Sequence, residues 1–374
     1  MKVNPYISSS MSAPLTGTES HTGNQGVVES VPNLEQALSL LESDSLNVAD
    51  LKTLSDTVNN QRSALNLMSS RNAEADIANS LNGAIDQYAK ELELIQGWTH
   101  GGKDMFNAAN RVIFNTIVSS GNVSGIKLED IFQIAIIDFM ANNSNIPTDV
   151  FGAMQHFLES TGTGSHGVHE GWDGTKFSQN TDLVWNYIKD NASPTSLSRE
   201  ILNYLDTNAG GKSALQSQYL TQFNNSDGYA FNSGFNKNNG LSPMLRLTLM
   251  SNYLKSNPDI KQAEMEIFLK GSFGEIESFV QNTTKEDLAD LLAKDSDWRV
   301  LEISPGNKVI DYEGVGLNSA FFVNLYQKFP PRVLSDEDTK NINRIGDTVK
   351  MIQQTLKYWI QIMRDERMAV ARNI

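Results

Sequence analysis

The sequence contains no cysteine in its 374 residues. It therefore offers no disulfide, and no thiolate for catalysis or for binding zinc. It also contains no run of Lys or Arg, and its formal net charge is −14. Because an acidic surface repels phosphate groups, we expect that the protein does not bind nucleic acid.

Long hydrophobic runs are also missing. No stretch approaches the ~20 apolar residues that cross a bilayer, so we expect no transmembrane segment. The most apolar window, Ile131–Met140, contains Asp138 and is typical of a buried helix.

Met1–Ser30 is rich in Ser, Thr, Gly and Asn and lacks the apolar core of a secretory signal. This segment is either a frayed tail or an uncleaved, unfolded export signal of the type III kind.

Motifs for catalysis are scarce. No Gly-x-Ser-x-Gly sequence is present, and Gly210–Ser213 resembles a phosphate loop only at its end, because Asp206 stands where that loop needs glycine. The sequence favours a protein without a catalytic residue, a metal or a cofactor.

One group of residues does resemble metal ligands. His166 and His169 lie three residues apart in a glycine-rich loop, followed by Glu170 and Asp173, and His156 precedes the loop. Two histidines at this spacing can meet one zinc ion. The commoner interpretation of such a segment is an exposed polar loop, and the metal site stays open as an alternative.

Apolar periodicity predicts a mainly α fold with a small α+β part. Residues at heptad spacing run from Leu51 to Ile95, with a slip near Asn72. Arg299–Ser304 and Lys308–Tyr312 alternate around Pro305–Asn307, which predicts a β-hairpin near 299–312. Just before the hairpin, Thr284 is expected to cap a helix over 285–292.

Four parts follow from these patterns. We expect a disordered export tail (1–32), a helical or coiled-coil region (33–100), a mostly helical globular domain (101–334) and a C-terminal coiled-coil helix (335–374). Ser335 and Asp338 predict a capping box at the start of the last helix.

The C-terminal helix carries the clearest pattern in the sequence. Its apolar residues are spaced alternately three and four apart and form a narrow stripe, here called the apolar seam: Ile342, Ile345, Val349, Ile352, Leu356, Trp359 and Met363, with Ile360 beside them. A narrow stripe must be buried against another helix. The N-terminal helices are one candidate, in a coiled coil or an ordinary bundle, and another chain is the second.

This order of parts resembles the needle-tip proteins, or hydrophilic translocators, of bacterial type III secretion systems, such as the V-antigen and invasion-antigen families. The likeness covers the polar tail to Ser30, the helical region through Ile95, the late hairpin and the terminal seam from Ile342. It implies long coiled-coil helices that flank an inserted globular domain. It also implies an exported virulence protein, secreted or held at the bacterial cell surface.

The resemblance further implies partners. These are the secretion needle subunits, other translocator proteins, and a dedicated chaperone or further copies of the chain. Two alternatives come from other classes of protein. One is an exported effector or metal-dependent hydrolase with a site near His166 and His169, and the other is a structural filament or phage-type subunit.

Overall fold

The computed structural model describes residues 36, 39–40, 48–67, 73–164, 171–223, 235, 240–305, 307–314 and 316–372. Two compact units divide the chain. The first combines Thr53–Tyr88 with Ile345–Ile374, and the second comprises Asn47–Lys52 and Ala89–Arg344. The division predicted from the sequence, with boundaries at 100/101 and 334/335, stays a prediction.

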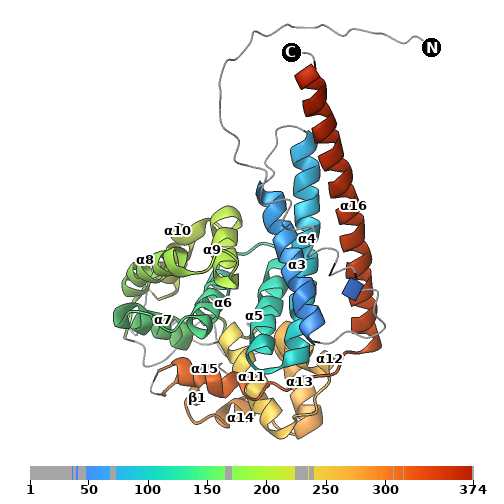
Figure 1. Ribbon diagram of the computed structural model, residues 1–374. Coiled ribbons are helices and arrows are strands. Elements are labelled where there is room, and N and C mark those ends of the chain that lie inside the picture. Colours follow the sequence, from blue (N-terminus) through green and yellow to red (C-terminus); the bar gives the residue numbers. More distant parts are fainter. Residues whose placement is uncertain are drawn as a thin grey trace, which may run out of the picture. The chain divides into compact units, whose positions relative to one another are not determined.

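The described residues form a mainly α fold with one small antiparallel sheet, which confirms the expected fold class (Figure 1). The helices are α3 (Val48–Leu67), α4 (Ala73–His100), α5 (Gly102–Ser119), α6 (Ile126–Asn142), α7 (Thr148–Ser160), α8 (Gly174–Asn191), α9 (Leu197–Asn208), α10 (Gly211–Gln222), α11 (Pro243–Ser256), α12 (Gln262–Lys270), α13 (Phe273–Thr284), α14 (Leu288–Ala293), α15 (Ser319–Tyr326) and α16 (Asp336–Arg372). The strands are β1 (Trp298–Ser304) and β2 (Asn307–Tyr312).

The hairpin of β1 and β2 is confirmed, and its register pairs Trp298 with Tyr312. The expected cap at Thr284 is wrong. Thr284 is the last residue of α13, and Asp287 caps α14 by accepting a hydrogen bond from the Asp290 N–H group. Lys285 explains the difference, because its φ of 67° is left-handed and ends the first helix.

Helix α6 is the centre of the second unit. Every residue from Leu128 to Met140 is buried, and α5, α7, α9, α10, α11 and α15 all contact the helix. In Figure 1, the green helices α7 to α10 gather on one side of it. A helix that is apolar all round must be buried, which is how the sequence predicted its place.

Four polar side chains are buried along α6 and need partners inside the protein: Glu129, Asp130, Gln133 and Asp138. Asp130 accepts hydrogen bonds from the backbone N–H (2.8 Å) and the hydroxyl (2.6 Å) of Thr163. Glu129 accepts one from the Gly162 N–H group at 3.0 Å. The carboxylates of Asp130 and Glu129 therefore bind the segment after α7 to α6.

The pKa of Asp130 is raised to about 7, mainly by burial and to a smaller extent by the neighbouring charge of Glu129. The two hydrogen bonds from Thr163 and the charge of Arg246 act in the opposite direction. Because the folded state then holds a proton that the unfolded state releases near pH 4, this group makes the protein less stable as the pH rises from about 4 to about 7.

Asp130→Asn tests this buried charge. The amide oxygen still accepts from the Thr163 N–H group, and the amide NH₂ donates to the Thr163 hydroxyl, so both contacts are kept without the charge. We expect the variant to be more stable than the wild type at pH 8, with a ceiling of about 4 kcal/mol from a shift of about 3 pKa units. The advantage disappears near pH 4.

Urea unfolding at a series of pH values from 4 to 8 measures the effect. Asp149→Asn removes an exposed carboxylate at the start of α7 and serves as the control. Parallel stability curves for Asp130→Asn and the wild type would contradict the assignment.

Candidate interaction surface

The start of α16 is fixed by two side chains. Ser335 donates its backbone N–H group (2.8 Å) and its hydroxyl (2.7 Å) to the Asp338 carboxylate, and Ser335 Oγ accepts from the Asp338 N–H group at 3.2 Å. This is the capping box that the sequence predicted. Arg332 adds an ion pair to Asp338 at 3.1 Å.

The segment that leads into α16 is bound to the end of α4. The Arg332 N–H group donates to the Trp98 carbonyl at 3.1 Å, and the Gly102 N–H group donates to the Phe329 carbonyl at 2.9 Å. The Arg332 guanidinium lies over the Trp98 ring at 5.8 Å from its centroid. We call these contacts between 98–102 and 329–332 the α4–α16 clamp.

Glycine at position 101 is required by this clamp. Gly101 has a φ of 68°, and a Cβ atom placed on it would lie 2.5 Å from the Pro331 nitrogen. Both the backbone conformation and the close approach exclude a side chain. Further from the clamp, Arg344 of α16 forms an ion pair with Glu91 of α4 at 2.7 Å.

Beyond the clamp, the first half of the apolar seam is buried. Ile342, Ile345, Val349 and Ile352 are 0, 2, 7 and 3% exposed. Ile345, Val349 and Ile352 belong to the first unit, in which Leu54 and Val58 of α3 and Ile85 of α4 are also buried. The helices from the two ends of the chain thus share one unit.

The second half of the seam falls outside the described side chains. Leu356, Trp359, Ile360 and Met363 lie within α16, whose backbone is described to Arg372. Their role against a coil or a partner stays a prediction.

Two exposed apolar residues lie on α16 outside the seam. Met351 is 59% exposed and Tyr358 is 64% exposed. They are separated by two helical turns and therefore share one face of the helix. The sequence analysis missed them because it followed the heptad stripe, although both are apolar residues at positions that the stripe does not use. We call them the exposed pair.

The predicted histidine group is only partly described. His166, His169 and Glu170 lie outside the described residues. His156 stacks on Trp172 with ring centroids 3.9 Å apart, and Asp173 caps α8 by accepting from the Lys176 N–H group. In the part of the chain that the structure describes, no group of three His, Asp or Glu side chains is placed to hold a metal ion.

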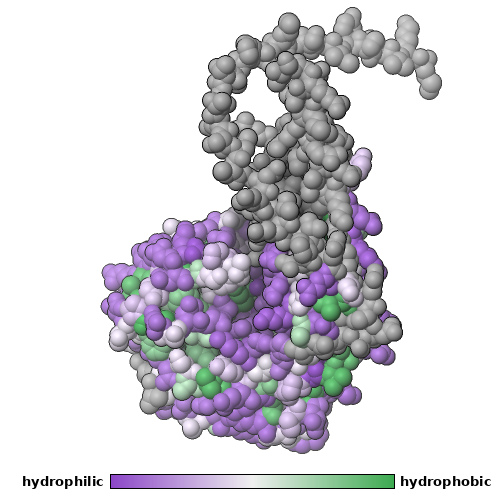
Figure 2. Space-filling model, viewed as in Figure 1, coloured by the Kyte–Doolittle hydropathy of each residue, from purple (hydrophilic) through white to green (hydrophobic). Residues whose placement is uncertain are grey.

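The sequence from 224 to 240 is rich in Asn and Gly with interleaved aromatic residues. Of its aromatic residues, the structure describes Phe235, whose side chain is buried and packs edge-on against Phe273 with ring centroids 5.0 Å apart. Tyr229 and Phe231 lie outside the described residues. On the face drawn in Figure 2, hydrophilic residues cover most of the described surface, and the apolar ones form small separate areas.

No helix within the described residues is long and apolar enough to cross a membrane. Comparison with protein-family models, with curated proteins and with solved structures gives no match.

Two neighbouring substitutions on α16 test whether the seam is the buried face of the helix and the face with Met351 is the exposed one. Ile352→Ala empties a buried position and should lower the free energy of unfolding by about 2–4 kcal/mol. Met351→Ala, one residue away and exposed, should change it by less than about 0.5 kcal/mol. Chemical denaturation followed by circular dichroism measures both, and equal losses would show that the seam is not the buried face.

Proposed function

We propose that this protein is an exported needle-tip or translocator-type protein of a type III secretion system, which acts through protein contacts in effector delivery and host-cell contact. The observation that carries the proposal is the exposed pair on α16. The helix already buries the described half of its seam, and yet it presents Met351 and Tyr358 to solvent on another face.

The arrangement of the chain supports the same function. The first unit joins helices from both ends of the chain, and Ala89–Arg344 is inserted between them. An inserted domain between paired terminal helices is what the resemblance to tip proteins implies. The α4–α16 clamp fixes the point where the chain leaves the inserted domain and enters the terminal helix.

A helix face with apolar residues two turns apart is suited to a helical partner. Residues seven apart lie on one face of a helix, so a single helical partner can contact Met351 and Tyr358 at the same time. We therefore assign the exposed pair to contact with a needle subunit, a second translocator, a chaperone or another copy of the chain.

The same surface also suits the filament-subunit alternative, in which the partner is always another copy. The hydrolase alternative depends on His166 and His169, which lie outside the described residues. No contact of the described residues favours it.

Export is the first test. Secretion of the protein is compared between the native bacterium and a strain without a functional type III export ATPase, and a variant lacking Met1–Ser30 is tested alongside. We expect the protein in the medium or at the cell surface only when the ATPase and the tail are both present. Retention in the cytoplasm of every strain would contradict the proposal.

The exposed pair is tested separately. The double variant Met351→Asp with Tyr358→Asp should fold like the wild type, because both side chains are exposed, but should lose surface assembly by at least about tenfold. Leu220→Asp on α10 changes another exposed apolar residue, which is 46% exposed, and is the matched control. Normal assembly of the double variant, or an equal loss in Leu220→Asp, would exclude this face as the contact.

A further inference from the structure

The sulfur chemistry of this protein is confined to methionine, because the sequence contains twelve methionines and no cysteine. The structure describes the side chains of seven of them. Met351 of α16 is 59% exposed. The other six belong to the core of the second unit and are between 0 and 4% exposed: Met105, Met140, Met154, Met244, Met250 and Met265. Among the described methionines, an oxidant in solution therefore meets one accessible side chain.

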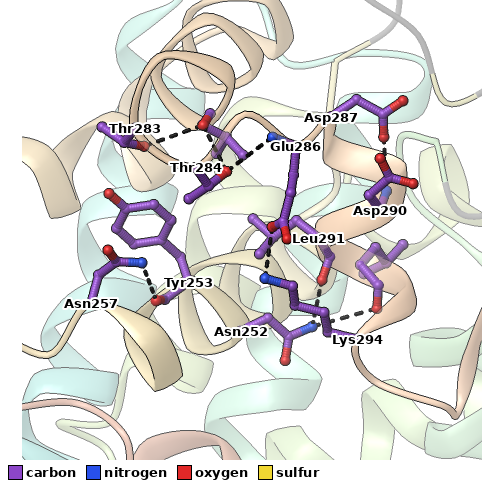
Figure 3. A network of polar contacts seen from close by, with 12 residues as sticks. Asn252, Tyr253, Asn257, Thr283, Thr284, Glu286, Asp287, Asp290, Leu291 and Lys294 are labelled. Carbon is purple, nitrogen blue, oxygen red and sulfur yellow. Dashed lines mark hydrogen bonds and ion pairs between the residues drawn. The ribbon is translucent and has the colours of Figure 1, made fainter.

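The buried methionines are enclosed by helices that hydrogen bonds hold together. Met244 lies in the first turn of α11, and its backbone N–H group donates to the Gln133 side chain of α6 at 3.0 Å. Further along α11, the Asn252 amide donates to the carbonyl of Leu291 in α14 at 3.2 Å (Figure 3). Exposure of Met244 or Met250 to solvent therefore requires α11 to separate from the helices that cover it.

Met351 differs from these residues because it lies outside the apolar seam of α16. Its neighbour Ile352, which belongs to the seam, is 3% exposed. Residues three and four positions apart are neighbours on one face of a helix. Asp347 and Gln354, at these distances from Met351, are also exposed. The neighbours of Met351 along this face thus leave its side chain open to solvent.

A peroxide oxidises a thioether by transfer of one oxygen atom. A lone pair of the sulfur attacks one oxygen of hydrogen peroxide, the O–O bond breaks, an S–O bond forms, and the other oxygen leaves as water. The product, methionine sulfoxide, is polar and no longer suits an apolar contact. Reductases restore the thioether with a dithiol, which becomes a disulfide as the oxygen leaves as water. The modification is therefore reversible.

Oxidation at this position should change a contact and leave the fold intact. The seam holds α16 in the first unit, since Ile345, Val349 and Ile352 are buried there. Changes at an exposed side chain away from such a seam have little effect on stability. A sulfoxide at any of the six buried methionines would instead disturb the packing of the core.

We propose that Met351 is an oxidation site, at which a peroxide in the surroundings of the cell forms the sulfoxide and thereby weakens the contact of α16 with its partner. The regulatory part of this proposal rests on the proposed function, in which the exposed pair makes that contact. The oxidation site itself rests on the burial of the other described methionines. Because a bound partner covers Met351, the free protein is the form that reacts.

Reaction of the purified full chain with hydrogen peroxide tests the site, and mass spectrometry of its peptides follows each methionine separately. We expect Met351 to be oxidised at least about tenfold faster than each of the six buried methionines. In concentrated urea all seven should react at similar rates, which shows that burial sets the difference. Equal rates in the folded chain, or loss of the circular dichroism signal in step with oxidation of Met351, would overturn the assignment.

Two substitutions test the effect on the contact. Met351→Leu keeps an apolar side chain of similar size that peroxide does not oxidise, and Met351→Gln imitates the polarity of the sulfoxide. After peroxide treatment of the cells, we expect the wild type to lose surface assembly by at least about threefold and Met351→Leu to keep it. Met351→Gln should show the same loss without peroxide. An equal loss in the wild type and Met351→Leu, or no loss in the wild type, would overturn the regulatory part.

The oxidation site and the proposed function fail separately. If neither the wild type nor Met351→Leu reaches the surface before peroxide is added, the proposed function is contradicted and the regulatory part fails with it. The rates measured on the purified chain still decide whether Met351 is the oxidation site.

Discussion

The burial of α6 from Leu128 to Met140 is the constraint on which the second unit depends. A helix with no solvent-facing side must satisfy its polar side chains inside the protein, and each of these side chains fixes a neighbouring segment. Asp130 and Glu129 hold the chain after α7, and Gln133 accepts from the Met244 N–H group at 3.0 Å at the start of α11. Asp138 accepts from the Ser198 N–H group at 2.9 Å, which fixes the start of α9. The apolar surface drives burial of the helix, and its few polar groups select one arrangement of the helices around it.

At the end of the inserted domain, backbone groups hold two chain segments together. At the α4–α16 clamp, glycine permits two chain segments to approach so closely that carbonyl and N–H groups pair directly. The ion pair of Arg332 with Asp338 then links the clamp to the first turn of α16. The terminal helix therefore begins at a position set by contacts distant in the sequence, and its cap and its anchor share one carboxylate.

Local patterns in the sequence were sufficient to predict the hairpin, the capping box at Ser335, and the burial of α6 and of the first half of the seam. Each of these features is determined by neighbouring residues. Thr284 was misread because a threonine before a helix resembles a cap, and the left-handed conformation of Lys285 has no clear sequence signal. The exposed pair was missed for a different reason. Whether Met351 is covered depends on segments far away in the chain, and periodicity carries no information about them.

The proton held by Asp130 has a consequence for the calorimetry of this protein. Between about pH 4 and about pH 7 the folded chain binds this proton and the unfolded chain releases it, so unfolding delivers a proton to the buffer. The heat of unfolding measured in that range therefore includes the heat with which the buffer takes up the proton. Two buffers of different ionisation enthalpy, such as phosphate and imidazole, would give different heats for the same unfolding reaction.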